Sequence, residues 1–216
     1  MRELKEFENY IFDLDGTLID SMSVWDNIGY DFLLSKGINP PDDLNDRLKT
    51  MSFEEAAEYF IKELKLNMPV PDIIKGVTET AADKYRYDIP LKPYVFDFIK
   101  KSADGNKRMC ILTASEEYYV VPLLKRLNIE KYFEKLITCT NISMSKSSFE
   151  IYQKAADIMG FDKGKTAVFE DAYHGIVNSK KAGFFTVAVY DSKEEENIGE
   201  IKKISDKFIM SFKELL

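Results

Sequence analysis

Two aspartates follow the first apolar run of the chain, within the string Phe12-Asp13-Leu14-Asp15-Gly16-Thr17. The apolar residues predict a strand, and Gly16 lets the chain turn sharply away from its end. In an open parallel sheet, ligands bind beyond the carboxyl ends of the strands. An ordinary Asp-Gly turn is the competing interpretation, but the whole string in this position favours a functional site that contains Asp13 and Asp15.

A hydroxyl group and a lysine occur at comparable places further along the chain. The apolar run Met109–Thr113 ends on a hydroxyl, and the backbone N–H groups from Ala114 onward open a predicted helix, which favours an anion there. Taken alone, Thr113 is better explained as a helix cap. Lys146, taken alone, is better explained as a solvated side chain.

A second acidic pair, Glu170 and Asp171, ends the apolar run that begins at Ala167. Such a pair can cap the helix that follows, or it can hold a divalent cation through its hard oxygen atoms. Together the strand ends supply a nucleophile, a second carboxylate, a hydroxyl, a lysine and an acidic pair. This set suits phosphoryl transfer, in which catalysis is mostly positioning and charge neutralisation.

Short apolar runs alternate with helical patterns along most of the chain. This predicts an α/β fold, a Rossmann-like, doubly wound parallel sheet with helices on both faces. The predicted strands are Tyr10–Leu14, Met109–Thr113, Lys135–Cys139, Ala167–Glu170, Thr186–Tyr190 and Phe208–Met210. The predicted helices include one that starts at Pro93, then Glu116–Leu127, Ser147–Met159 and Tyr173–Ala182, the last stopped by Gly183.

The segment from about Ser21 to Asp88 breaks the alternation, because it contains only helical patterns. One of these begins with the capping box Ser52-Phe53-Glu54-Glu55. We therefore expect an α/β core domain of residues 1–19 and 90–216, with an inserted all-helical cap domain of residues 20–89. The two crossings between them are natural hinges, and a hinged lid usually closes a site.

Composition narrows the class of protein. The chain has 216 residues, 45% of them hydrophobic, and a formal net charge of −7, so a disordered chain, a nucleic-acid partner and a membrane surface are not expected. The two cysteines cannot form a disulfide framework, the first ten residues do not resemble a secretory signal, and no apolar run is long enough to span a bilayer. We expect a cytoplasmic protein.

The chain resembles the haloacid dehalogenase superfamily, in its branch of β-phosphoglucomutase-like phosphatases with a helical cap. The resemblance covers essentially the whole chain. It rests on four motifs in order: Asp13-Leu14-Asp15-Gly16-Thr17-Leu18, Leu112-Thr113-Ala114-Ser115, Lys146, and Phe169-Glu170-Asp171 continuing to Gly175-Ile176 and Ala182-Gly183. Phe149 departs from the pattern, since many relatives have proline there, and we expect this to alter a loop and not the chemistry.

The resemblance implies a role for each motif. Asp13 would attack phosphorus and form an aspartyl-phosphate. Asp15 would protonate the leaving oxygen and then activate the water that hydrolyses the intermediate. Thr113 and the N–H group of Ala114 would hold phosphate oxygens, and Lys146 would offset the repulsion between nucleophile and phosphate.

The resemblance also implies Mg²⁺ as the cofactor. The ion would lie between Asp13, the main-chain carbonyl of Asp15 and Asp171, with Glu170 as a ligand of second choice. Members of the superfamily that act on other leaving groups lack an aspartate at the position of Asp15. Its presence restricts the chain to phosphate esters or to phosphomutase chemistry.

The cap segment favours hydrolysis over a mutase reaction. The related mutases carry a histidine at the position of Trp25, twelve residues after the nucleophile, and an arginine at the position of Phe53. A phenylalanine cannot grip a second phosphate. Trp25 and Met51 either line the cap side of the substrate pocket or pack in the cap core, and Lys49 could reach a polar substrate.

The leading hypothesis is a Mg²⁺-dependent phosphatase that hydrolyses a small phosphorylated metabolite, of the sugar or polyol phosphate type. A sugar-phosphate mutase is the first alternative, and a non-catalytic phosphate-binding protein is the second. We expect a monomer or a homodimer.

Overall fold

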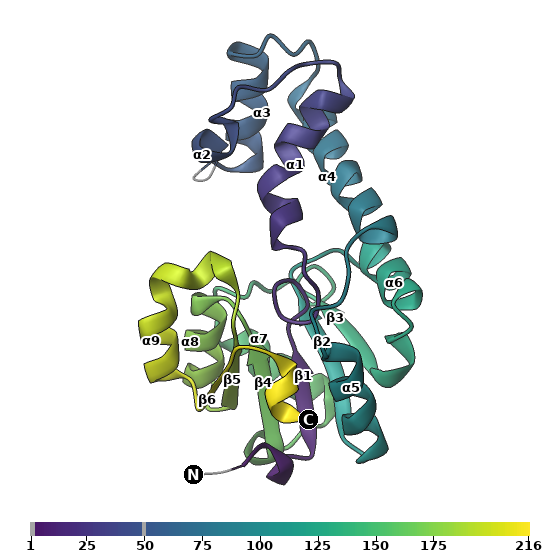
Figure 1. Cartoon of the computed structure of the whole chain (residues 1–216), viewed down its shortest axis with the longest axis vertical. Coiled ribbons are helices and arrows are strands. Elements are labelled where there is room, and N and C mark those ends of the chain that lie inside the picture. Colours follow the sequence, from purple (N-terminus) through teal and green to yellow (C-terminus); the bar gives the residue numbers. More distant parts are fainter. Residues whose placement is uncertain (1–2, 49–50) are drawn as a thin grey trace. The chain divides into compact units, whose positions relative to one another are not determined.

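The computed structural model describes residues 3–48 and 51–216, and it forms two compact units (Figure 1). The first unit joins the chain up to Asp20 to Ile89–Leu216, and the second consists of Ser21–Asp88.

A parallel sheet of six strands forms the centre of the first unit, in the order β3-β2-β1-β4-β5-β6. The predicted fold class is therefore confirmed. Strand order reverses between β1 and β4, where a doubly wound sheet binds its ligands. The strands are β1 Asn9–Phe12, β2 Arg108–Thr113, β3 Lys135–Thr138, β4 Thr166–Glu170, β5 Phe185–Val189 and β6 Lys207–Ile209.

Alternate residues of β1 face opposite layers, because successive side chains in a strand point to opposite faces. On one face, Tyr10 and Phe12 pack with the rings of Phe98 and Phe169, which in turn contact the ring of Phe212. On the other face, Ile11 belongs to a buried cluster with Cys110, Leu112, Val168 and the helix that carries Ile151 and Tyr152. Both faces of the central strand are thus covered, as its unbroken apolar sequence requires.

In the described part of this unit, five α-helices and several short 3-10 helices surround the sheet (Figure 1). The α-helices are α5 Val95–Asp104, α6 Glu117–Arg126, α7 Glu150–Met159, α8 Tyr173–Lys181 and α9 Ile198–Ile204. The shorter turns are η1 Leu4–Glu6, η2 Glu130–Tyr132, η3 Lys163–Lys165, η4 Ser192–Asn197 and η5 Phe212–Leu215.

Two predicted boundaries were wrong by a few residues. The first strand ends at Phe12 and not at Leu14, because the turn that brings the Gly16 N–H to the Ile19 carbonyl has already begun. The helix expected from Ser147 begins at Glu150, because the Ser145 hydroxyl accepts from the Ser147 N–H and holds this segment in a turn. Ser and Thr side chains commonly compete with helical hydrogen bonds in this way.

The second unit consists of helices and connecting loops over its described residues. They are α1 Met22–Ser35, α2 Leu44–Leu48, α3 Phe53–Lys62 and α4 Val70–Tyr87. The capping box predicted at Ser52 is present: the Glu55 N–H donates to Ser52 Oγ at 3.2 Å, and the Ser52 N–H donates to Glu55 Oε2 at 2.7 Å. Helices α1 and α4 approach closely at Gly76, where a Cβ atom would lie 2.4 Å from the Phe32 ring.

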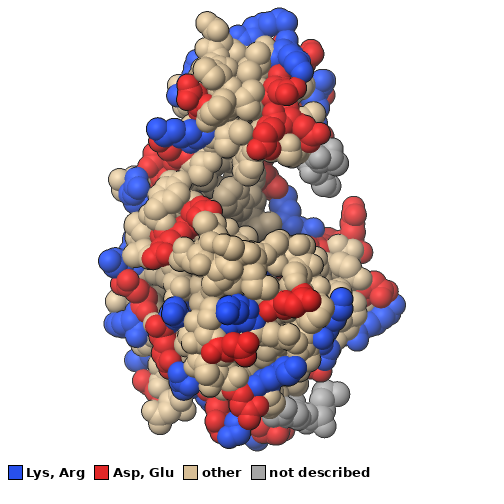
Figure 2. All heavy atoms as spheres, turned by 180° about the vertical axis from the view of Figure 1, so that it is seen from behind, with Lys and Arg blue, Asp and Glu red and all other residues tan. Residues whose placement is uncertain are grey.

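The surface carries charges of both signs. On the face drawn in Figure 2, lysine and arginine side chains lie among aspartate and glutamate side chains without a continuous basic block. Among the described residues, no helix is both long enough and apolar enough to cross a bilayer.

Candidate active site

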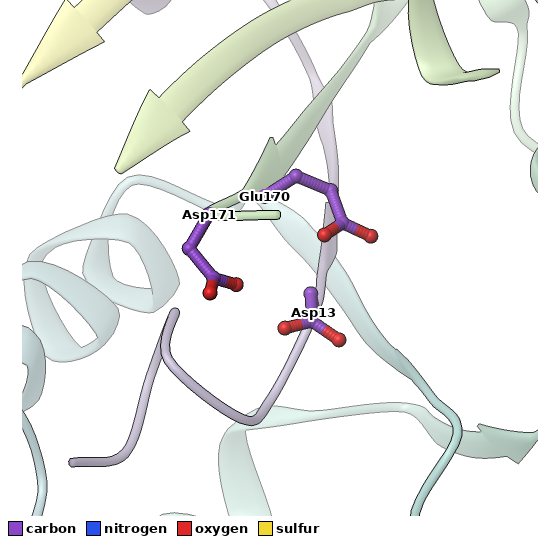
Figure 3. Close-up of side chains that lie close together, drawn as sticks. All are labelled: Asp13, Glu170 and Asp171. Atoms are coloured by element: carbon purple, nitrogen blue, oxygen red, sulfur yellow. The ribbon is translucent and has the colours of Figure 1, made fainter. Parts of the chain in front are cut away.

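Three strand ends meet at the centre of the sheet edge. The register pairs Phe12 of β1 with Ile111 of β2 and with Phe169 of β4, and the Asp13 N–H continues the ladder by donating to the Phe169 carbonyl at 2.9 Å. Since parallel strands end on the same side, the residues that follow Phe12 and Phe169 must come together. The side chains of Asp13, Glu170 and Asp171 turn toward one another there (Figure 3).

These three carboxylates form a buried cluster. Asp13 is 7% exposed, Glu170 is 1% exposed and Asp171 is 4% exposed, and one oxygen atom of each lies within 4.8 Å of the others. Burial raises the pKa of Asp171 well above its usual value, and the neighbouring carboxylates of Asp13 and Glu170 raise it further. Burial also raises the pKa of Asp13, against the opposing effect of the Lys146 ammonium.

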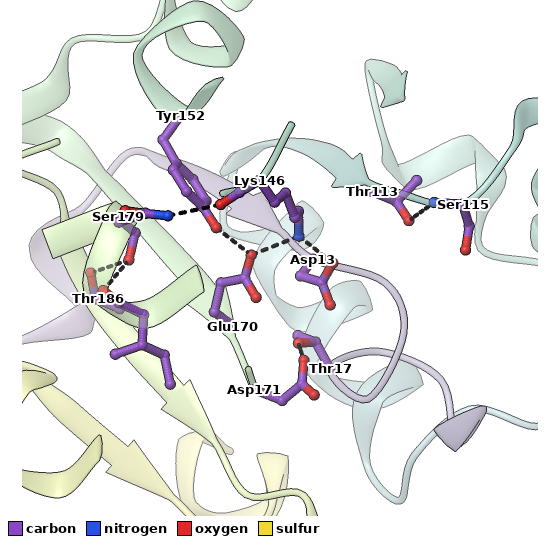
Figure 4. Close-up of polar contacts among 12 residues, drawn as sticks. Asp13, Thr17, Thr113, Ser115, Lys146, Tyr152, Glu170, Asp171, Ser179 and Thr186 are labelled. Carbon is purple, nitrogen blue, oxygen red and sulfur yellow. Dashed lines mark hydrogen bonds and ion pairs between the residues drawn. The ribbon is translucent and has the colours of Figure 1, made fainter. Parts of the chain in front are cut away.

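The ammonium group of Lys146 lies against two of these carboxylates. Its Nζ donates to Asp13 Oδ1 and, at 2.6 Å, to Glu170 Oε1, and the side chain is buried (Figure 4). Burial alone would lower the pKa of Lys146, but Asp13 and Glu170 more than offset this and hold the pKa above its usual value. The interpretation of Lys146 as a solvated lysine is therefore wrong.

The charges of this cluster suit a divalent cation. If all three carboxylates were ionised, the cluster and the Lys146 ammonium would together carry two net negative charges in a buried space. Carboxylate oxygens are the ligands that Mg²⁺ prefers, and a cation would lower the raised pKa values of Asp13 and Asp171. Asp171 also approaches the turn so closely that a Cβ atom on Gly16 would lie 2.2 Å from Asp171 Oδ2, so the cluster and the turn are fitted to each other.

The end of β2 supplies hydroxyl groups. Thr113 is fully buried, and its Oγ1 accepts a hydrogen bond from the Ser115 N–H at 3.0 Å, so the hydroxyl proton of Thr113 can be directed toward an anion. Ala114 is exposed, and α6 begins only at Glu117. The helix predicted from Glu116 is thus present with a difference of one residue, and a bend held by Thr113 Oγ1 precedes it.

Several residues that sequence reasoning missed hold the site together. The Ser115 hydroxyl donates to Asp15 Oδ2 at 2.6 Å, and the Thr17 hydroxyl donates to Asp171 Oδ1 at 2.8 Å. The Tyr152 hydroxyl donates to Glu170 Oε1 at 2.7 Å, and Asn178 Nδ2 donates to the Lys146 carbonyl at 2.8 Å. Thr17 and Ser115 stand inside the motifs that predicted the site, so their positions in the sequence could have identified them. No sequence pattern singles out Tyr152 or Asn178.

The first unit thus brings together seven of the predicted site residues: Asp13, Asp15, Thr113, Ala114, Lys146, Glu170 and Asp171. Trp25 and Met51 belong to the second unit. There Trp25 is half-buried and its Nε1 donates to the hydroxyl of the buried Tyr85 at 3.0 Å, while Met51 lies at a shallow hollow beside Glu55 and Tyr59. Lys49 lies outside the described residues.

Comparisons with known proteins agree with this geometry. A phosphorylated carbohydrates phosphatase from Thermotoga maritima is 23% identical, over 82% of this chain and 82% of that protein. Hexitol phosphatase B from Escherichia coli is 24% identical, over 83% of this chain and 82% of its own.

Solved structures share the fold. A crystal structure from Thermotoga maritima, described as a β-phosphoglucomutase, superposes with a TM-score of 0.82 at 22% identity and covers 94% of both chains. CbbY from Rhodobacter sphaeroides in complex with phosphate gives a TM-score of 0.75 at 21% identity, over 97% of this chain and 96% of that chain.

The family match spans most of the chain and includes every strand end of the site. The family model of haloacid dehalogenase-like hydrolases matches residues 10–189, from the first strand to the end of β5. The resemblance found in the sequence is confirmed, and the chain belongs to the haloacid dehalogenase-like hydrolases.

Proposed function

We propose that this hydrolase is a Mg²⁺-dependent phosphatase of small phosphorylated metabolites, of the sugar or polyol phosphate type. The observation that carries the proposal is the buried position of Asp13, between the Lys146 ammonium and an acidic pair that can hold a cation. The named relatives support the substrate class, because they include phosphatases of phosphorylated carbohydrates, of hexitol phosphates and of fructose 1-phosphate.

Asp13 is the nucleophile of this proposal. Its carboxylate oxygen attacks phosphorus, the bond from phosphorus to the ester oxygen breaks, and an aspartyl-phosphate forms. Lys146 contacts the same carboxylate, so it reduces the repulsion between two anionic groups as they approach. Thr113 and the N–H group of Ala114 hold the phosphate oxygens in line with the nucleophile.

Asp15 moves the protons in both halves of the reaction. In the first half its carboxylic acid gives a proton to the leaving oxygen, which departs as an alcohol. In the second half its carboxylate takes a proton from water, whose oxygen attacks phosphorus and releases Asp13. The two halves together release the alcohol and inorganic phosphate, and they return Asp13 to its free carboxylate and Asp15 to its carboxylic acid.

Mg²⁺ would be held by Asp13, by the main-chain carbonyl of Asp15 and by Asp171, and it would supply positive charge to the transferring phosphoryl group. Glu170 is placed differently. Its Oε1 already accepts from both Lys146 and Tyr152, so we assign Glu170 first to the orientation of Lys146 and only second to the cation.

A sugar-phosphate mutase is the second candidate, because structures described as β-phosphoglucomutases share the fold. A mutase must bind a second phosphate while the first is transferred. Phe53 is the first residue of α3 and is half exposed, but it offers no charged group to a phosphate, and Trp25 donates its N–H group to Tyr85. Hydrolysis by water is therefore favoured.

A panel of phosphorylated sugars, polyols and p-nitrophenyl phosphate tests the proposal by release of inorganic phosphate in the presence of Mg²⁺. We expect release from at least one sugar or polyol phosphate. We also expect little or no glucose 6-phosphate from β-glucose 1-phosphate supplied with glucose 1,6-bisphosphate. Efficient isomerisation with negligible phosphate release would favour the mutase. Phosphate binding without turnover of any ester would favour the non-catalytic alternative.

A further inference from the structure

Ser115 connects two parts of the site that are far apart in the sequence. Its hydroxyl donates to Asp15 Oδ2 at 2.6 Å, which joins the loop after β2 to the turn after β1. The serine itself is held firmly, because it is buried and its N–H donates to Thr113 Oγ1 at 3.0 Å (Figure 4).

Asp15 needs such a support. Its main chain lies in a tight turn in which the Gly16 N–H donates to the Ile19 carbonyl at 3.0 Å. The turn fixes the backbone but leaves the side-chain torsions of a half-buried aspartate to its neighbours. A general acid works only when its proton lies within hydrogen-bond reach of the leaving oxygen.

We propose that Ser115 is the positioning residue of Asp15, and that it aims this carboxyl group at the leaving oxygen and then at the attacking water. The proposal rests on the phosphatase function proposed above. Ser115 does not itself exchange a proton with substrate. It holds Oδ2, while the proton that Asp15 gives and takes can travel on Oδ1, so the contact persists in both protonation states. A hydroxyl donor serves both states because carboxylate and carboxylic acid each present an acceptor oxygen.

This role predicts a dependence on the leaving group. A poorly leaving alcohol, such as a polyol, needs the proton of Asp15 as its ester bond breaks. The nitrophenolate ion leaves without such help. A misplaced Asp15 therefore slows the cleavage of alkyl phosphates far more than the cleavage of p-nitrophenyl phosphate, whereas a general distortion of the site slows both alike.

The test compares kcat/KM of wild type and Ser115→Ala on both kinds of ester, because kcat/KM reports the steps up to formation of the aspartyl-phosphate. We expect a loss of about ten- to hundred-fold on a sugar or polyol phosphate, the usual effect of removing one hydrogen bond to a charged group. On p-nitrophenyl phosphate we expect less than about a three-fold loss.

Two further variants separate positioning from folding. Ser115→Thr keeps the hydroxyl and should restore most of the lost activity on alkyl phosphates. Ser179→Ala removes another buried serine hydroxyl, which lies 2.8 Å from the Thr186 hydroxyl, and should leave the ratio of the two kcat/KM values unchanged. A crystal structure of Ser115→Ala should show the Asp15 side chain turned away from its wild-type direction.

The possible failures are distinguishable. If the wild type is active but kcat/KM of Ser115→Ala falls by the same factor on both esters, or falls on neither, only the role of Ser115 is overturned. An unmoved Asp15 side chain in the variant structure would do the same. A wild-type protein that releases phosphate from no ester would overturn the proposed function, and this role with it.

Discussion

Lys146 is buried against Asp13 and Glu170, and such an ion pair is costly to assemble because all its charges leave water. The added hydrogen bond from Tyr152 and the support of the Lys146 carbonyl by Asn178 offset part of that cost. A protein that needed only stability could fill this space with apolar side chains. The position of these charges at the strand ends therefore indicates chemistry.

Replacement of Asp13 by asparagine tests the nucleophile. The shape is kept, but the amide has no negative charge with which to attack phosphorus or to bind a cation. We expect Asp13→Asn to lose nearly all turnover, about a thousand-fold or more, since the covalent route is removed. Lys146 keeps Glu170 as its partner, so thermal unfolding should remain cooperative. Near-normal phosphate release by a folded variant would rule out the aspartyl-phosphate.

Replacement of Tyr152 by phenylalanine tests the network around Glu170. The change removes a buried hydrogen bond to a charged group, so the free energy of unfolding should fall by about 1–3 kcal/mol, as measured by denaturant titration. Activity should fall several-fold, because Lys146 loses part of its support. Tyr10→Phe is the matched control, since the Tyr10 hydroxyl donates to the Leu4 carbonyl at 3.3 Å and not to a site residue, and its activity should be unchanged. Equal activity losses in both variants would contradict the assignment.

At the scale of residues, the sequence predicted the charged residues of the site but not the residues that hydrogen-bond to them. Asp13, Asp15 and Asp171 stand at strand ends, a position that a pattern can reveal. Tyr152 occurs at helical spacing and looks like any core residue. Whether its hydroxyl reaches Glu170 depends on how α7 packs on the sheet, which periodicity does not determine.

At the scale of elements, the turn between the end of β1 and Ile19 determines the geometry of the site. Gly16 has a φ of +77°, where other residues are strained, and a Cβ atom there would collide with Asp171 Oδ2. Gly160, at the end of α7, has a φ of +64° and nothing within 4 Å of its Cβ position. The two glycines share the backbone requirement and differ only in their surroundings.

This difference gives a paired prediction. Gly16→Ala and Gly160→Ala should each lower the free energy of unfolding by about 1–2 kcal/mol, because both force a left-handed alanine. Only Gly16→Ala should also displace Asp171, lower kcat/KM and raise the Mg²⁺ concentration that gives half of full activity. If the two variants have equal activity and equal Mg²⁺ dependence, the close contact between the Gly16 turn and Asp171 is not needed for catalysis.

The order and type of the elements followed from hydrophobic periodicity, and all six predicted strands are present. Their ends were less predictable. The helix α7 starts late because the Ser145 side chain competes for the backbone N–H of Ser147, and the sequence alone does not show which hydrogen bond is stronger. The α/β alternation predicted a parallel sheet but not the strand order β3-β2-β1-β4-β5-β6, which depends on where each crossover connection places its strand.

At the scale of the molecule, a net charge of −7 works against an anionic substrate. In the proposed mechanism, Lys146 and a bound cation would supply the local positive charge. We expect chelation by EDTA to abolish phosphate release and added Mg²⁺ to restore it. Asp171→Ala should raise the Mg²⁺ requirement by an order of magnitude or more, because one hard ligand is lost.

Asp206→Ala is the control for this measurement. Asp206 pairs with Lys180 at 2.7 Å and accepts from the Thr186 N–H at 2.8 Å, so it is structurally engaged but is not part of the acidic cluster. Its Mg²⁺ requirement should equal that of wild type. If the wild type keeps full activity in excess chelator, the proposed Mg²⁺ dependence is wrong.

The hydrogen bond from Trp25 to Tyr85 has a practical consequence for spectroscopy. Trp25 is the single tryptophan of the chain, and both partners belong to the second unit. Indole fluorescence therefore reports on that unit by itself, whereas far-ultraviolet circular dichroism follows the helices of both units and the strands of the first unit. One heated sample, read by both signals, would reveal whether the two units melt together or in sequence.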